Sequence, residues 1–485
     1  MLNELKAQSN LKYTRNGALT HETSYSYCLD LFFQAGAMRS RSENDIETAV
    51  IRAFAEDPAA AMKILFFARD IRGGLGERRF FRTAVRMLAE LEPDAVCRNI
   101  GNFAEYGRFD DLCALLGTPC EREAVAEIRR QLDADNAAMA QQRPASLLAK
   151  WLPSVNASCR DTREQGRLLA MRLGMTERQY RKNLASLRRY TDILENRLRE
   201  RDYTFDYSKL PSNAAFRYRK AFLRNDSERY EAYLESVNAG RSKMHTATLY
   251  PYEIVRACLD RTSREERLAL DTAWRNLPVY GAAGENAIAV IDGSGSMYCG
   301  STLRPVDVAL SLGLYFAEHS RGAFAGHFIT FSSRPQLVEI KGDDIAAKVR
   351  YCSSFNEIAN TDLEAVFDLI LETALANRFP QSELPAKLYI ISDMEFDYCI
   401  VGGNSLPMFD AMRQKYAANG YILPQVVFWN VNACQSNLPV KKSETGAALV
   451  SGASASVFDL VTGGKLSPLQ IMLDVINSER YARVA

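Results

Sequence analysis

The sequence lacks the patterns that place a metal ion on thiols or imidazoles. Its 10 cysteines form no Cys-x-x-Cys pair, and its 4 histidines show no zinc-binding spacing. Scattered cysteines in a chain of 485 residues are typical of reduced, buried thiols, whereas disulfide frameworks occur in short, cysteine-dense chains. These absences exclude the zinc-ribbon and disulfide-scaffold classes of protein.

Long hydrophobic runs and a strong net charge are also missing. No apolar run reaches the length of a membrane span, and the polar N-terminus has no apolar core of a signal peptide. We therefore expect a cytoplasmic protein with no membrane partner. The net charge is +1, but residues 1–285 carry 45 basic and 39 acidic side chains, whereas residues 286–485 carry 15 and 20. This asymmetry indicates two parts with different partners.

The first part, residues 1–275, is predicted to be a helical, repeat-like domain of HEAT-like helix pairs. Asp57 and Pro58 form a helix start, and Thr176 with Gln179 forms a capping box before a helix predicted over 177–201. Hydrophobic residues make up 47% of the chain and charged residues 25%, which is typical of globular domains. The Gly- and Ala-rich residues 276–285 are a predicted linker.

The second part, residues 286–485, alternates apolar strands with helices. The pattern predicts strands at 287–291, 327–331, 337–340, 387–391, 425–432 and 447–451, and helices at 306–318, 361–377, 408–418 and 466–478. Such alternation is typical of a doubly wound, mostly parallel sheet. The predicted fold class is therefore an all-helical domain followed by an α/β domain.

Oxygen-bearing side chains follow the strands of this sheet. Asp292-Gly-Ser294-Gly-Ser296 directly follows the first strand, Thr361 lies in a second loop, and Ser392-Asp393 follows a third segment. Ligands bind at the carboxyl ends of strands in such sheets, and hydroxyl and carboxylate oxygens suit Mg²⁺ or Mn²⁺ better than zinc. A HAD-type phosphatase would need a second aspartate at position 294, where this chain has serine.

These residues resemble the metal-ion-dependent adhesion site of von Willebrand factor A domains, whose signature is Asp-x-Ser-x-Ser, then Thr, then Asp. The resemblance implies that Ser294, Ser296 and Thr361 contact the metal. It also implies that Asp292 and Asp393 contact the metal directly or through water. The resemblance covers about 200 residues at the C-terminal end.

The helical part resembles the Ro-type (TROVE-module) RNA-binding proteins. It is similar at least as much to an uncharacterised bacterial, viral and plant family of the same two-part design. The segments that carry this resemblance are 69–78, 150–153 and 249–255. The resemblance implies a helical array that binds single-stranded RNA ends or small structured RNA. It transfers no individual RNA-contacting residue.

Basic side chains concentrate in the middle of the chain. The segments 177–201 and 216–224 carry the candidate RNA-binding residues Arg178, Arg181, Lys182, Arg188, Arg189, Arg217, Arg219, Lys220 and Arg224. Aromatic and basic residues alternate in the second segment, which suits single-stranded nucleic acid. The alternative interpretation remains open, because any amphipathic helix has a solvated charged face.

We expect a non-enzymatic RNA-binding scaffold with a Mg²⁺-binding domain and no catalytic residues. An alternative is a metal-dependent adaptor for a partner protein such as an AAA+ ATPase, in which the partner donates an acidic side chain to the metal. A phosphoesterase or nuclease is a weaker alternative, because the sequence shows no general base near Asp292-Gly-Ser294.

Overall fold

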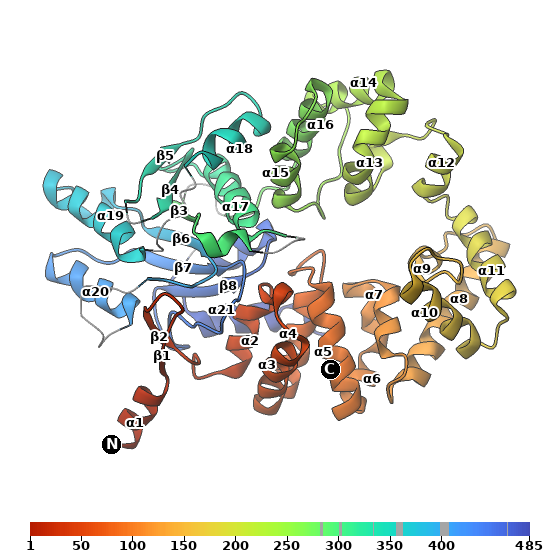
Figure 1. Cartoon of the computed structure of the whole chain (residues 1–485), viewed down its shortest axis with the longest axis horizontal. Helices are drawn as coiled ribbons and strands as arrows, with labels where there is room; N and C mark the ends of the chain where they lie inside the picture. The colour runs from red at the N-terminus through yellow and green to blue at the C-terminus, as the bar shows by residue number, and fades with distance from the viewer. Residues whose placement is uncertain (282–284, 300–302, 333, 356–361, 398–406, 463) are drawn as a thin grey trace.

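The computed structural model describes residues 1–281, 285–299, 303–332, 334–355, 362–397, 407–462 and 464–485. It confirms the predicted fold class, because a helical region precedes a sheet flanked by helices (Figure 1). The chain begins with helix α1 (Leu2–Ser9) and a hairpin of strands β1 (Leu11–Tyr13) and β2 (Leu19–His21). Among the described residues, no helix is both long and apolar enough to span a bilayer.

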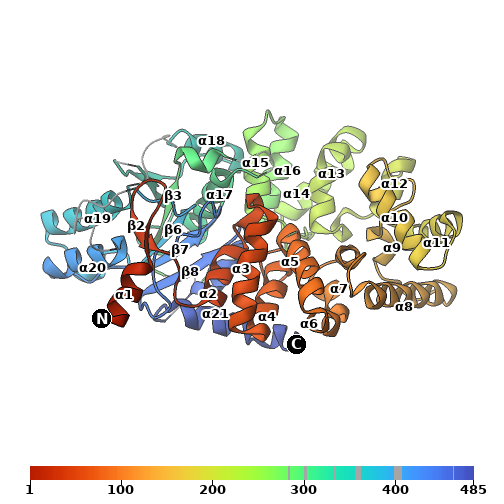
Figure 2. The same ribbon diagram turned by 60° about the horizontal axis from the view of Figure 1, so that its bottom comes forward.

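The helical region forms an arc of short helices (Figure 2). Asp57 caps the fourth helix by accepting a hydrogen bond from the amide of Ala60, and Thr176 and Gln179 form the predicted capping box. The helices are α2 (Tyr27–Ala35), α3 (Glu43–Glu56), α4 (Pro58–Arg69), α5 (Arg78–Leu91), α6 (Pro93–Arg98), α7 (Phe103–Tyr106), α8 (Glu121–Ala140), α9 (Leu148–Trp151), α10 (Arg160–Arg172), α11 (Glu177–Tyr190), α12 (Leu194–Glu200), α13 (Ser212–Asn225), α14 (Ser227–Asn238), α15 (Pro251–Leu259) and α16 (Arg264–Arg275).

The single helix predicted over 177–201 is wrong. The structure has two helices there, because α11 ends at Tyr190 and α12 begins at Leu194. Asp192 between them has a φ of 48°, in the left-handed region, where a right-handed helix cannot continue. The apolar stripe continues across the break, since Leu187 and Leu194 are both buried, and for this reason the periodicity did not reveal the break.

The C-terminal part contains the predicted sheet of six strands. The strands are β3 (Ala287–Asp292), β4 (His327–Phe331), β5 (Leu337–Glu339), β6 (Lys387–Ser392), β7 (Gln425–Asn430) and β8 (Ala447–Ser451). Their order is β5-β4-β3-β6-β7-β8, and all neighbours are parallel except the antiparallel pair β4 and β5. The helices are α17 (Pro305–His319), α18 (Ile345–Ser353), α19 (Leu363–Asn377), α20 (Met408–Ala418) and α21 (Pro468–Ile476), of which α18 was not predicted.

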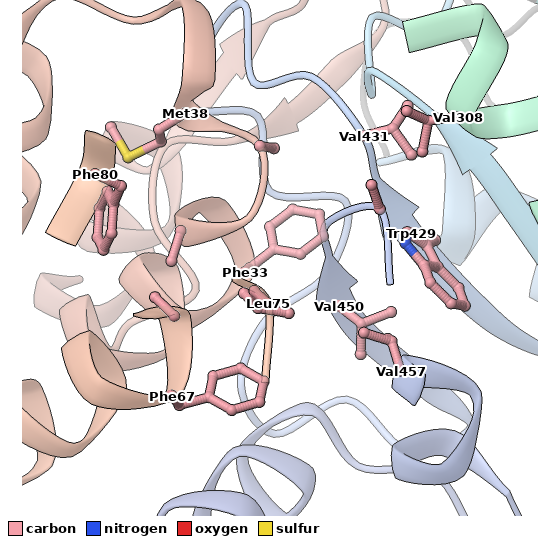
Figure 3. Close-up of a cluster of buried hydrophobic side chains, with 14 of the residues drawn as sticks. Phe33, Met38, Phe67, Leu75, Phe80, Val308, Trp429, Val431, Val450 and Val457 are labelled. Carbon is pink, nitrogen blue, oxygen red and sulfur yellow. The ribbon is translucent and has the colours of Figure 1, made fainter. Parts of the chain in front are cut away.

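The two parts share one hydrophobic core. Figure 3 shows Phe33 of α2 and Leu75 facing Val450 of β8, with Trp429 of β7 behind. The last helices of the arc also contact the sheet domain, since α15 packs against α17 and α18. Because the core is continuous, separation of the two parts would expose buried apolar surface at both ends of the arc.

A turn between α4 and α5 joins the helical region to the C-terminal end of the chain. A Cβ atom on Gly74 would lie 2.0 Å from the carbonyl oxygen of Phe67, so this turn requires glycine. Asp70, at the end of α4, is fully buried and accepts hydrogen bonds from Arg480 and from the hydroxyl of Tyr481. The last residues of the chain are thereby fixed to the first helices.

The N-terminal hairpin lies on the C-terminal domain, an arrangement that the sequence did not predict. Thr14 Oγ1 donates to the carbonyl oxygen of Phe396 at 2.6 Å, and Asn16 Nδ2 donates to that of Glu395 at 2.7 Å. His21 and Leu438 exchange backbone hydrogen bonds of 3.1 and 3.2 Å. The hairpin therefore contacts residues 395–396, just after β6, and residue 438, after β7.

Buried His21 makes the attachment of this hairpin sensitive to acid. Burial, and then the nearby charge of Lys441, lower the pKa of His21 from 6.5 to about 4. The unfolded chain binds a proton below about pH 6.5 and the folded chain does not, so stability falls as the pH drops from about 6.5 to about 4. We expect His21 to contribute about 3 kcal/mol to this loss, given about 1.4 kcal/mol per pKa unit.

The measurement is urea unfolding of the parent, His21→Asn and His245→Asn at pH 7 and pH 5. The difference in unfolding free energy between the parent and His21→Asn should narrow at pH 5. His245→Asn, which removes an exposed histidine, is the matched control. A gap for His21→Asn that stays constant between the two pH values would show that His21 does not titrate in this way.

Candidate metal centre

The end of β3 places three of the predicted metal-binding residues together. Asp292 is fully buried, and its Oδ1 accepts a hydrogen bond of 2.8 Å from the backbone amide of Ser294. The hydroxyl oxygens of Ser294 and Ser296 lie 3.1 Å apart. Gly313 of α17 allows β3 and this helix to approach closely, because a Cβ atom there would lie 2.2 Å from Ile291 Cδ1. The loop is thus held by backbone geometry as well as by side chains.

The end of β6 places Asp393 beside this loop. Ser392 Oγ donates a hydrogen bond of 2.6 Å to Asp292 Oδ2, which connects the two strand ends. Met394 follows with a φ of 64°, a left-handed conformation that costs a side-chain-bearing residue about 1 kcal/mol. Asp393, just before this turn, is fully buried and lies close enough to Asp292 to be affected by its charge.

Two buried carboxyl groups in one place are electrostatically unfavourable. Burial, and then the neighbouring charge of Asp292, raise the pKa of Asp393 to about 7. Burial also raises the pKa of Asp292, although hydrogen bonds from Ser392 and Ser294 oppose this shift. Asp393 Oδ2 is buried and has no hydrogen-bond partner among the described residues. A cation at this point would compensate both carboxylates.

The donor set can hold a hard divalent cation. Asp292, Asp393, Ser294 and Ser296 supply only oxygen atoms, which suit Mg²⁺ or Mn²⁺. Within the described parts of the chain, no three or more His, Cys, Asp and Glu side chains converge as metal ligands, so the candidate site depends on hydroxyls for the remaining ligands. The fifth predicted residue, Thr361, lies outside the described residues.

Glu395 is a member of this neighbourhood that the sequence analysis missed. It is buried, its Oε2 accepts a hydrogen bond of 2.9 Å from the backbone amide of Arg15, and its Oε1 is without a partner among the described residues. Its charge contributes to the raised pKa of Asp393. No local pattern identifies Glu395, because its importance comes from the distant hairpin that covers it.

The structure separates the predicted RNA-binding residues into two groups. Arg178, Arg181, Lys182, Arg189, Arg217, Lys220 and Arg224 are exposed, whereas Arg188 is half-buried and Arg219 is buried. Arg188 donates to the carbonyl oxygens of Ala149 and Leu152 and to Ser154 Oγ, and Arg219 pairs with Glu266 at 3.1 Å. These two arginines therefore stabilise the fold, and the exposed ones remain as candidates.

Two family models match the two parts of the chain. Residues 286–467 match DUF7788, and residues 14–132 and 161–282 match DUF2828; both are described as domains of unknown function. The two matched parts are referred to below as the DUF2828 region and the DUF7788 domain, after the models that they are similar to. The DUF7788 match contains β3 to β8 and both strand ends of the candidate metal centre, and the DUF2828 match begins inside the N-terminal hairpin.

A viral protein shares both parts. The "Uncharacterized protein L728" of Acanthamoeba polyphaga mimivirus is 28% identical over 512 residues, which cover 96% of this chain and 87% of the viral protein. The similarity therefore extends across the DUF2828 region and the DUF7788 domain together.

Proposed function

We propose that this protein is a non-enzymatic scaffold that binds RNA through its DUF2828 region and carries Mg²⁺ (or Mn²⁺) in its DUF7788 domain. The observation that carries the RNA assignment is a group of cations on α11. Arg178, Arg181, Lys182 and Arg189 are exposed, and none has an acidic partner within the described residues. Unpaired cations on one helix attract the phosphates of a nucleic acid, with release of counterions.

The resemblance of the helical segments to Ro-type proteins supports RNA over other polyanions. The segment 216–224 adds exposed Arg217 and Arg224 farther along the arc. The aromatic rings of this segment make packing contacts within the protein instead, since Phe222 is buried against Tyr207 and Phe216 lies under the guanidinium of Arg219. We therefore assign this segment to phosphate contacts and not to base stacking.

The metal would be held by Asp292, Ser294, Ser296, Thr361 and Asp393. With only two carboxylates around it, the bound ion would stay electrophilic and would attract an acidic or phosphate oxygen from outside the chain. The protein's own residues fix the two strand-end loops, and Asp393 would exchange its proton for the cation.

The test of RNA binding is fluorescence anisotropy of a labelled single-stranded RNA oligonucleotide over a range of salt concentrations. We expect the Arg178→Glu/Lys182→Glu variant to bind at least about tenfold more weakly and to lose about 1.4 from the slope of log K against log salt, about 0.7 for each phosphate contact. The matched control is Arg321→Glu/Lys465→Glu, which makes the same charge change on exposed residues of the DUF7788 domain. Equal weakening by the two variants would contradict a local RNA-binding face.

A second candidate function is a metal-dependent adaptor for a partner protein, for example an AAA+ ATPase. The buried Oδ2 of Asp393, which has no hydrogen-bond partner among the described residues, supports this candidate as well, because a cation held there would attract an acidic side chain of a partner. A pull-down with and without EDTA distinguishes the two functions. Capture of an ATPase that is lost with EDTA, with no nucleic acid present, would favour the adaptor.

A further inference from the structure

A pocket lies beside α11. Helix α11 is at the end of the molecule farthest from the sheet (Figures 1 and 2). Its volume is about 470 Å³, and it lies between α11, α12 and residues 154–156. This volume is within the range of about 300–1,000 Å³ that is typical of small-molecule sites. Five arginines line it, Arg181, Arg188, Arg189, Arg197 and Arg199, together with the amide side chain of Asn156.

One wall of this pocket is fixed by buried contacts. Arg188 donates hydrogen bonds of 2.7 and 2.9 Å to the carbonyl oxygens of Ala149 and Leu152, and one of 2.8 Å to Ser154 Oγ. The hydroxyl of Tyr180 donates to the carbonyl oxygen of Pro153 at 2.9 Å. Residues 149–154 are therefore held against α11, so a ligand would bind without the cost of ordering this wall.

The cations of the pocket differ in their freedom to bind a ligand. Arg197 pairs with Asp192 and Asp202, and Arg199 pairs with Glu200. Arg181 and Arg189 are exposed and have no acidic partner within the described residues. They are eight positions apart, about two turns on one face of α11, so both can reach the same pocket. The pocket thus combines a fixed wall with two uncompensated guanidinium groups.

We propose that this pocket holds one phosphorylated nucleotide unit of a single-stranded RNA. Guanidinium groups form bidentate hydrogen bonds with phosphate oxygens, which is the role of Arg181 and Arg189. The amide of Asn156 can donate and accept hydrogen bonds at a base edge. This assignment rests on the proposed RNA-binding function, and it places the specific contact in a pocket, separate from the other exposed cations of α11.

The test fills the pocket without changing its charge. Ala185 lines the pocket, and its neighbour Ser186 is also exposed on α11 but does not line the pocket. Ala185→Trp and its matched control Ser186→Trp are compared with the parent by anisotropy of the labelled single-stranded RNA. We expect Ala185→Trp to weaken binding at least about tenfold and Ser186→Trp to change it less than about twofold. Arg181→Ala/Arg189→Ala should resemble Ala185→Trp.

Calorimetric titration with 5′-AMP separates this proposal from the function on which it rests. Full RNA affinity in Ala185→Trp would overturn the pocket assignment and leave the RNA-binding scaffold intact. The parent could bind 5′-AMP but not RNA, with binding of 5′-AMP lost in Ala185→Trp. This result would support a nucleotide pocket and overturn the assignment to RNA. A parent that binds neither would overturn both.

Discussion

Replacement of Asp292 with alanine is expected to abolish Mg²⁺ binding and to leave the DUF2828 region folded. Asp292 is fully buried and connects the two strand ends through Ser294 and Ser392, so no other side chain can replace it. The parent should gain about 2.7 kcal/mol of stability at a Mg²⁺ concentration about 100 times the dissociation constant, whereas the variant should gain nothing. Thermal unfolding with and without Mg²⁺ measures both values.

Without metal, the same variant should unfold within about 1 kcal/mol of the parent. The loss of two hydrogen bonds is offset by the removal of a carboxyl group whose burial beside Asp393 is unfavourable. Asp343→Ala, at an exposed position of the same domain, is the control and should retain the full response to Mg²⁺. A variant Asp292→Ala that binds Mg²⁺ as tightly as the parent would show that the site is assigned wrongly.

Replacement of Asp70 with alanine is expected to release the C-terminal end of the chain from the first helices. Asp70 is fully buried and accepts hydrogen bonds from Arg480, Tyr481 and the backbone amide of Arg72. Removal of one partner of a buried ion pair leaves the other without compensation. Because Arg480 is partly exposed, we expect a loss of about 2–4 kcal/mol in the free energy of unfolding, measured by urea denaturation.

Hydrogen exchange locates the effect of this change. Amides of residues 479–485 should exchange faster in Asp70→Ala, while those of the central strands β3 and β6 should change only through the lower global stability. Asp133→Ala, on an exposed position of α8, should lie within about 0.5 kcal/mol of the parent. Unchanged exchange at residues 479–485 would contradict the conclusion that Asp70 fixes the C-terminal end of the chain to the first helices.

Local sequence patterns were sufficient to predict the sheet, because strands β3, β6 and β8 are buried along their whole length. β3 and β8 are completely buried apolar segments of five or six residues, and the antiparallel edge strand β5 is also where the pattern placed it. The N-terminal hairpin escaped prediction because its two strands have three residues each and pair with loops more than 370 residues away. Contacts between residues so far apart in the sequence do not affect the local spacing of apolar and polar residues.

The positions of four residues of the candidate metal centre could be predicted because the strands that carry them could be predicted. Asp292, Ser294, Ser296 and Asp393 follow β3 and β6, whose carboxyl ends are adjacent in the sheet. Glu395 could not be predicted, since only the distant amide of Arg15 shows what its carboxylate contacts. Likewise, the sequence does not distinguish Arg188 from Arg189. Only the hydrogen bonds of Arg188 to residues 149–154 give it a structural role, whereas Arg189 has no acidic partner among the described residues.

The measurement that tests the central claim most directly is the absorbance ratio at 260 and 280 nm of the protein purified at low salt, followed by sequencing of any bound nucleic acid. We expect RNA to copurify and to dissociate at high salt, because phosphate contacts weaken steeply as salt rises. The Arg178→Glu/Lys182→Glu variant should carry less RNA than the parent. The account would be contradicted if the protein purified without nucleic acid and bound neither single-stranded nor structured RNA when they were added.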